Sequence, residues 1–173
     1  FELIEPVFAS SKPDVENKLK LDNKQLSVVS AIEQYPRYIC EGAAGTGKTL
    51  LAVELVRRLL HDNENVLFIC KSSWLKAYLK SVLQHENLTT SSISSLKQDS
   101  RRKFISRYDV VVVDEAQDLY QDDSLLLLGS FLKGGLEQVR WYFFQDLAHQ
   151  GMFYADPSNS SIKNIRTHDY QKT

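Results

Sequence analysis

A glycine-rich stretch between residues 42 and 49 has the composition and spacing of a phosphate-binding loop. It reads Gly42-Ala43-Ala44-Gly45-Thr46-Gly47-Lys48-Thr49. The glycines let the backbone turn tightly so that successive N–H groups face an anion, and the N-terminus of a following helix adds partial positive charge. In this pattern the lysine reaches the β- and γ-phosphates of a nucleotide and the threonine hydroxyl ligates Mg²⁺. These eight residues are therefore predicted to bind ATP, with Thr49 as a magnesium ligand.

Two carboxylates follow an apolar run further along the chain. Val110–Val113 leads directly into Asp114 and Glu115. In a nucleotide-hydrolysing site, the first acid holds the hydrated Mg²⁺ ion and the second polarises the attacking water. Two acids at a strand end also occur in solvated turns, but the loop at residues 42–49 favours the functional interpretation. We therefore predict Asp114 as a metal ligand, and Glu115 and Lys48 as catalytic residues.

Strands and helices alternate around these residues. Apolar runs predict strands at Arg37–Glu41, Asn65–Cys70, Asn87–Ser95, Tyr108–Asp114 and Gln138–Phe144. Periodic apolar positions and capping residues predict helices at Leu21–Gln34, Lys48–His61, Ser73–Gln84 and Asp123–Leu132. Such alternation is typical of βαβ units. The predicted fold class is therefore α/β, a three-layer P-loop NTPase with a mainly parallel sheet.

The letters of both motifs resemble motifs I and II of superfamily 1 helicases of the UvrD/Rep kind. The second match is Asp-Glu-Ala-Gln-Asp at 114–118, and Leu-Asp-Asn-Lys-Gln at 21–25 is similar to the Q motif of that family. The resemblance implies a RecA-like ATPase domain with ATP at the carboxyl ends of the strands. It also implies that Gln25 contacts adenine. The spacing of Asp22 and Gln25 fits a capping box as well, and one glutamine can serve both roles.

Two stretches nearer the C-terminus resemble later motifs of the same family. Residues 144–150 resemble motif III, which implies that Gln150 faces the γ-phosphate, although it lies four residues after Asp146 where the family usually has three. Residues 164–167 resemble motif IV, whose arginine reaches the γ-phosphate from a second RecA-like domain, which implies a catalytic role for Arg166. The family prefers an aromatic residue where Ile165 stands. A solvated arginine in a polar tail is the alternative for Arg166.

These resemblances suggest a division of the chain into three parts. We expect residues 1–20 to be an irregular lead-in, residues 21–155 to be the first motor domain, and residues 156–173 to be a linker and the start of a truncated second motor domain. The chain begins with Phe1 and shows no motif V or VI. Only about 38 residues separate Ser72 from Val110, where helicases of this kind carry a sizeable insertion. We therefore expect an excised piece of a longer protein.

Candidate nucleic-acid contacts are less specific. Lys71–Trp74 stands where relatives present motif Ia to single-stranded DNA, and Trp74 can stack on a base, but its amphipathic surroundings favour a place in the core. A basic run can contact phosphates or simply be solvated; it contains Lys97, Arg101, Arg102, Lys103 and Arg107. The resemblance implies two partners for the full-length protein: single-stranded nucleic acid, DNA more than RNA, and a second RecA-like domain of the same chain.

Composition limits the class of protein. With 43% hydrophobic and 25% charged residues, the 173-residue chain is not of a disordered or low-complexity type. The net charge of −1 gives no overall signal for nucleic acid, so such binding needs a local patch. No apolar run approaches the ~20 residues of a membrane span, so we expect no membrane partner. Cys40 and Cys70 end apolar runs and are predicted to be buried thiols, which fits a reducing cytoplasm.

The function predicted from these observations is ATP binding and Mg²⁺-dependent hydrolysis by the first motor domain of a superfamily 1 DNA helicase-like protein. The alternative is a nucleotide-gated binding or regulatory module without translocation. A P-loop kinase is disfavoured, because no lid-like or acceptor-site pattern lies near the motifs.

Overall fold

The computed structural model describes residues 21–103, 107–120, 123–146 and 171–172. Six parallel strands form one sheet in the order β3-β2-β4-β5-β1-β6. The strands are β1 (Arg37–Gly42), β2 (Val66–Ile69), β3 (Leu88–Ser91), β4 (Val110–Asp114), β5 (Arg140–Asp146) and β6 (Gln171–Lys172). The predicted fold class, an α/β protein with a mainly parallel sheet, is confirmed.

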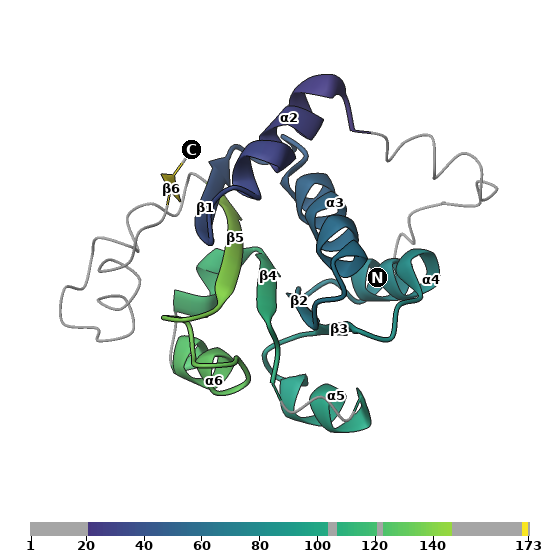
Figure 1. The fold of residues 1–173 in the computed structure, drawn as a ribbon, viewed down its shortest axis with the longest axis vertical. Helices are drawn as coiled ribbons and strands as arrows, with labels where there is room; N and C mark the ends of the chain where they lie inside the picture. The colour runs from purple at the N-terminus through teal and green to yellow at the C-terminus, as the bar shows by residue number, and fades with distance from the viewer. Residues whose placement is uncertain (1–20, 104–106, 121–122, 147–170, 173) are drawn as a thin grey trace, which may run out of the picture.

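Helices cover both faces of this sheet. They are α2 (Asn23–Ile32), α3 (Lys48–His61), α4 (Ser73–Leu83), α5 (Leu96–Lys103), the 3₁₀ helix η1 (Ala116–Tyr120) and α6 (Ser124–Ser130). Figure 1 shows α2, α3 and α4 on one side of the sheet and α5 and α6 on the other. Among the described helices, none is long and apolar enough to cross a bilayer.

The central strands are apolar throughout because each face is buried under helices. All five residues of β4 are buried, and its side chains alternate between two core clusters. Val110 and Val112 pack with α3 on one side, whereas Val111 and Val113 pack with α6 and η1 on the other. Both cysteines are free and buried in this core, as the sequence predicts.

Three described elements, α5, η1 and β6, are missing from the sequence prediction. Among the α5 residues whose burial the structure describes, only Leu96 and Ser100 are buried, so the polar sequence of this helix has no apolar period to reveal it. The 3₁₀ helix η1 follows the acidic pair directly and is too short for a period. Residues 171–172, which the sequence analysis assigned to the start of a second motor domain, pair with β1 in this sheet.

Candidate nucleotide-binding site

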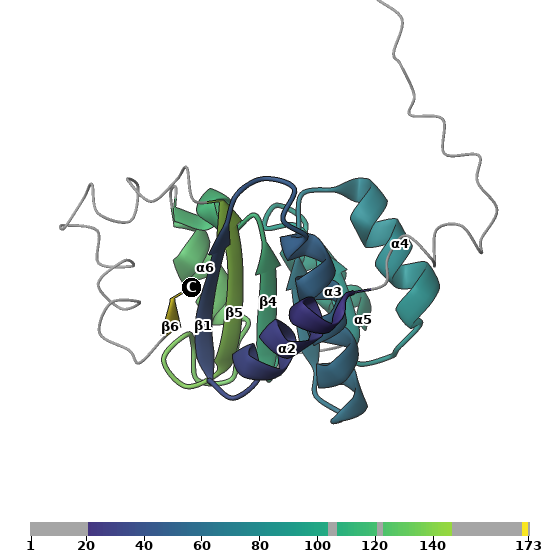
Figure 2. The same ribbon diagram turned by 90° about the horizontal axis from the view of Figure 1, so that it is seen from above.

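The phosphate-binding loop joins the carboxyl end of β1 to the first turn of α3. Figure 2 shows this loop arching over one end of the sheet. Gly45 and Gly47 have positive φ angles of 79° and 88°, a region that favours glycine. No side chain caps the N-terminus of α3. The N–H groups of its first turn are therefore free of a side-chain acceptor and suited to an anion.

Lys48 is almost buried inside this loop. Its Nζ donates to the carbonyl oxygens of Gly42 at 3.0 Å and Ala43 at 2.8 Å, and it lies 2.7 Å from Asp146 Oδ1. Asp146 ends β5, whose register pairs it with Gly42. The phosphate-binding loop therefore holds the Lys48 ammonium group through its own carbonyl oxygens. The adjacent Asp146 carboxylate neutralises the lysine charge.

Thr49 and Asp114 meet although 65 residues separate them. Thr49 Oγ1 donates to Asp114 Oδ2 at 3.0 Å, and the Asp114 side chain is almost buried at the carboxyl end of β4. Burial raises the pKa of Asp114 above its ordinary value and the charge of Glu115 adds to this, while the hydrogen bond from Thr49 opposes it. A cation beside this carboxylate would offset the cost of burying its charge.

Glu115 lies just beyond Asp114 in a left-handed backbone conformation. Its φ of 59° is uncommon for a residue with a side chain and typical of strained positions at functional sites. The Glu115 side chain is exposed, and Gln117 Nε2 donates to its Oε2. The carboxylate is therefore held at the edge of the site, accessible to water.

Gln25 forms the capping box that the sequence analysis considered for it, and its contact with adenine stays a prediction. Its Oε1 accepts from the Asp22 backbone N–H at 3.0 Å, and Asp22 Oδ1 accepts from the Gln25 N–H at 2.8 Å, which completes a capping box. Its amide also lies against the phosphate-binding loop, because a Cβ placed on Gly47 would lie 2.8 Å from Gln25 Nε2. The capping bonds hold the amide beside the nucleotide loop.

Polar contacts that the sequence analysis did not predict support the rim of this site. Buried Gln145 accepts from the Tyr120 hydroxyl at 2.5 Å and donates to Glu41 Oε1 at 2.7 Å. This chain of contacts joins η1, the end of β5 and the entry to the phosphate-binding loop. Lys71, after β2, lies 2.8 Å from Asp118 of η1. No local sequence signal predicts these contacts, because each partner comes from a different strand end.

Trp74 corrects one prediction. The sequence favoured a core position, but the side chain is 61% exposed and stacks on Tyr78 with ring centroids 5.4 Å apart. Helix α4 buries Leu75 and Leu79, so a residue one position before Leu75 points away from the core. Trp74 instead lines a hollow of about 590 Å³ that also contains Lys71, Thr49 and Glu115.

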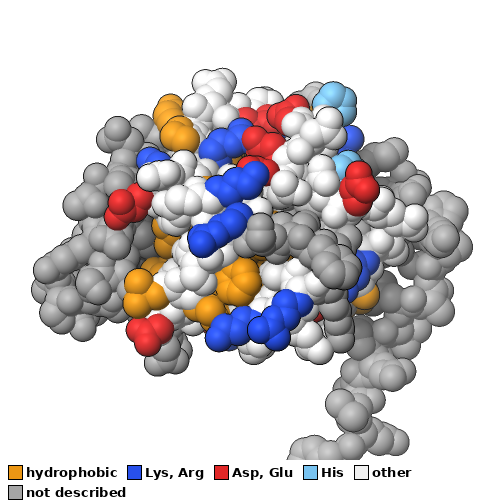
Figure 3. Space-filling model, turned by 60° about the horizontal axis from the view of Figure 1, so that its bottom comes forward, with side chains coloured by type: hydrophobic (Ala, Val, Ile, Leu, Met, Phe, Trp, Pro, Cys, Tyr) orange, Lys and Arg blue, Asp and Glu red, His pale blue; other side chains and the backbone are white. Residues whose placement is uncertain are grey.

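The basic run belongs partly to α5. Lys97, Arg101 and Arg107 are exposed, and Arg107 also donates to the Leu132 carbonyl at 3.2 Å. Figure 3 shows Lys and Arg side chains beside hydrophobic ones across one face of the molecule, with a group of acidic side chains next to them in its upper part. The chain therefore carries local basic surface despite its net charge of −1.

Gln150 and Arg166, the catalytic residues suggested by motifs III and IV, lie outside the described residues. Their roles stay predictions. The described site consists of Gln25, the loop at residues 42–49, Asp114, Glu115 and Asp146.

Comparison with known proteins identifies the family. Residues 37–140, more than half of the chain, match the family model described as Schlafen group 3, DNA/RNA helicase domain. The chain belongs to this Schlafen family. The matched region runs from the start of β1 to the start of β5 and so includes the phosphate-binding loop and the acidic pair. No curated protein sequence matches the chain.

Solved structures of other proteins share the fold of this chain. The Pyrococcus furiosus Hef helicase domain has a TM-score of 0.56 and 13% identity, over 91% of this chain and 39% of that one. The Sulfolobus solfataricus SWI2/SNF2 ATPase core in complex with dsDNA has a TM-score of 0.57 and 13% identity. The match covers 94% of this chain and 37% of that one. The chain thus spans well under half of either structure. At such identity the likeness shows the fold alone, so the superfamily 1 assignment stays a prediction.

Proposed function

We propose that this chain binds ATP and hydrolyses it with Mg²⁺, as the first motor domain of a superfamily 1-type helicase. The observation that carries the proposal is the 3.0 Å hydrogen bond between Thr49 and Asp114. It joins the last residue of the phosphate-binding loop to the first residue of the acidic pair, which is the arrangement that a shared magnesium site requires.

The oxygen donors present suit Mg²⁺. A threonine hydroxyl and an almost buried carboxylate are hard ligands, and Mg²⁺ commonly takes one or two protein oxygens together with phosphate and water. Thr49 and Asp114 would hold the ion, which would neutralise charge on the phosphates when bound. Lys48 would leave Asp146 for the phosphate oxygens, and Glu115 would orient and polarise the attacking water.

Nucleic acid is the proposed partner of Trp74 and Lys71, which line the same hollow as the magnesium-site residues Thr49 and Asp114. Exposed Trp74 offers an aromatic face for a base, and Lys71 offers a charge for a phosphate within the same hollow. The SWI2/SNF2 core to which the chain is similar is described in complex with dsDNA. We propose single-stranded DNA rather than RNA, together with a second RecA-like domain.

Calorimetric titration with Mg·ATP tests the nucleotide part of the proposal. Lys48→Ala is expected to abolish measurable binding, because Lys48 is the cation that the loop directs towards the phosphates. Arg57→Ala removes the same charge from an exposed position on α3 and serves as the matched control, with binding expected to persist. Unchanged binding by the Lys48 variant would show that the loop has a structural role only.

Phosphate release in the full-length protein, measured with and without single-stranded DNA, tests the motor part. Stimulation by DNA supports a motor that couples hydrolysis to nucleic acid. ATP binding without stimulation favours the alternative, a nucleotide-gated binding module.

A further inference from the structure

We propose that Arg58 is a positioning residue for base recognition: it ties helix α2 to helix α3 and so holds the Gln25 amide beside the nucleotide loop. The inference rests on the proposed function, since it assumes that Gln25 contacts adenine. It concerns a residue near the far end of α3, away from the phosphate-binding loop.

Helix α2 has little apolar contact of its own to fix its position. Of its ten residues, only Val29 and Ile32 are buried. Two buried side chains allow a short helix to slide or rock on its neighbour, because burying each contributes only about 1.5–3 kcal/mol. The placement of Gln25 at the N-terminus of α2 therefore depends on additional contacts.

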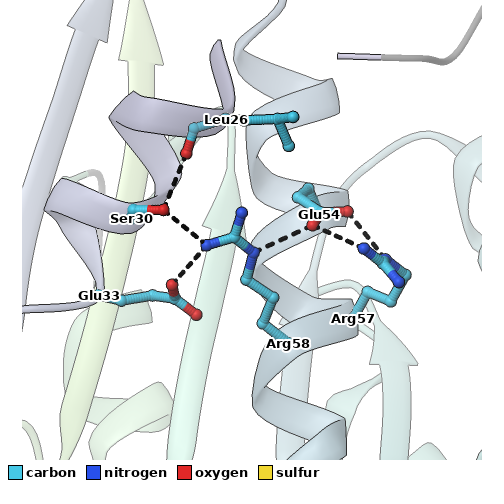
Figure 4. A network of polar contacts seen from close by, with 6 residues as sticks. All are labelled: Leu26, Ser30, Glu33, Glu54, Arg57 and Arg58. Carbon is cyan, nitrogen blue, oxygen red and sulfur yellow. Dashed lines mark hydrogen bonds and ion pairs between the residues drawn. The ribbon is translucent and has the colours of Figure 1, made fainter. Parts of the chain in front are cut away.

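Arg58 provides such contacts at the other end of α2, as Figure 4 shows. Its Nη1 donates to Glu33 Oε2 at 2.7 Å and to Ser30 Oγ at 3.0 Å. Both partners lie on the last turn of α2 or directly after it. Its Nε donates to Glu54 Oε1 on α3 at 3.0 Å, which fixes the guanidinium in place. Hydrogen bonds with charged partners are stronger than neutral ones, and here they are partly shielded from water.

The two helices run side by side and touch at both ends. At the N-terminal ends, Gln25 lies against Gly47. At the C-terminal ends, Arg58 holds Glu33 and Ser30. Because α3 begins in the phosphate-binding loop and is packed in the core along its length, it forms a rigid base for α2. Without the Arg58 contact, α2 can shift on α3 and move the Gln25 amide relative to a bound base.

Arg57 offers a matched control on the adjacent position of the same helix. Its guanidinium donates twice to Glu54, at 2.8 Å each, and is 64% exposed. Removal of Arg57 changes the charge of the chain as much as removal of Arg58 does. However, every contact shown for Arg57 stays within α3, so its removal leaves the attachment of α2 intact.

The experiment measures affinities for Mg·ATP, Mg·GTP and inorganic tripolyphosphate in the parent chain and in Arg58→Ala, Glu33→Gln and Arg57→Ala. We expect the parent to prefer ATP over GTP by about fivefold or more, the size of a lost base hydrogen bond. Arg58→Ala should bring this ratio close to one, and Glu33→Gln should lower it. Tripolyphosphate has no base, so its affinity should stay within about twofold in all variants and report an intact loop.

The outcomes separate this inference from the proposed function. A retained preference for ATP in Arg58→Ala would overturn the inference, as would an equal loss of preference in Arg57→Ala. Equal affinities of the parent for ATP and GTP would also overturn it, while nucleotide binding would still stand. A parent chain that binds neither nucleotide would contradict the proposed function itself.

Discussion

Glu115 combines three properties expected of a residue that activates water. It follows the buried carboxylate Asp114, its backbone is strained with a φ of 59°, and its side chain is exposed. A strained residue is retained only where the surrounding structure enforces it. Here η1 helps to hold the Glu115 backbone in this conformation, because the Asp118 N–H donates to the Glu115 carbonyl at 3.1 Å.

Glu115→Gln is expected to preserve Mg·ATP affinity and lower the rate of hydrolysis by about 10²–10⁴-fold, because the amide keeps the shape but not the basic charge. Single-turnover hydrolysis with the full-length protein in excess over labelled ATP measures the rate, and calorimetry measures the affinity. Equal rates in the variant and the parent would place the base elsewhere.

Cys70 gives a pH-dependent prediction. Burial raises the pKa of its thiol to about 11, and the nearby Asp114 charge adds to this. Thiolate forms more readily in the unfolded chain, so this thiol favours the folded state below pH 9, and the contribution is lost as the pH rises towards 11. At pH 8.5 iodoacetamide should modify Cys70 far more slowly in the folded chain than in urea, as measured by peptide mass spectrometry. Equal rates in both conditions would contradict the burial.

At the scale of elements, the phosphate-binding loop and helix α2 approach each other at Gly47, next to the Gln25 amide. Alanine at either Gly45 or Gly47 would require a left-handed conformation, which costs about 1–2 kcal/mol. Only at Gly47 would the new Cβ also meet Gln25, whose amide would lie 2.8 Å away; at Gly45 nothing lies within 4 Å. The two positions therefore separate backbone strain from displacement of Gln25.

Gly45→Ala and Gly47→Ala are expected to lose similar stability in urea unfolding, because the backbone penalty is shared. Gly47→Ala alone should also reduce the ratio of ATP to GTP affinity, since Gln25 must move aside. If Gly45→Ala reduces the ratio as much, loop conformation rather than Gln25 determines base preference.

At the scale of the whole molecule, the Hef and SWI2/SNF2 structures that share this fold are much longer than this chain. This chain covers 39% and 37% of their lengths. We propose that a second RecA-like domain completes the ATP cleft and supplies an arginine to the γ-phosphate. In P-loop enzymes such an arginine contributes about 10³–10⁵-fold in rate.

Residues 1–173 alone are therefore expected to hydrolyse ATP very slowly compared with the full-length protein. The measurement is steady-state phosphate release by both, with and without single-stranded DNA. Turnover by the 173 residues as fast as by the full-length protein, with or without DNA, would replace the two-domain motor with a self-sufficient ATPase.

Local sequence determined most of the elements and the two chemical motifs. The described strands β1 to β5, together with α2, α3, α4 and α6, overlap the ranges predicted from apolar runs and period, since these patterns report burial directly. The loop and the acidic pair are equally local, because each function needs neighbouring residues. Helix α5 was not predicted because its sequence has almost no apolar residues that could form a periodic pattern.

Tertiary structure alone decided which distant groups meet. The sheet order sets β5 beside β1, so that Asp146 reaches Lys48, and the close approach of α3 to β4 brings Thr49 to Asp114. Likewise, the amphipathic spacing of α4 showed that one side of this helix is buried. It did not show that Trp74 lies on the exposed side. Charge on α3 did not reveal that Arg58 binds α2. Such contacts depend on how elements pack in three dimensions, and a periodic pattern carries no information about the partner.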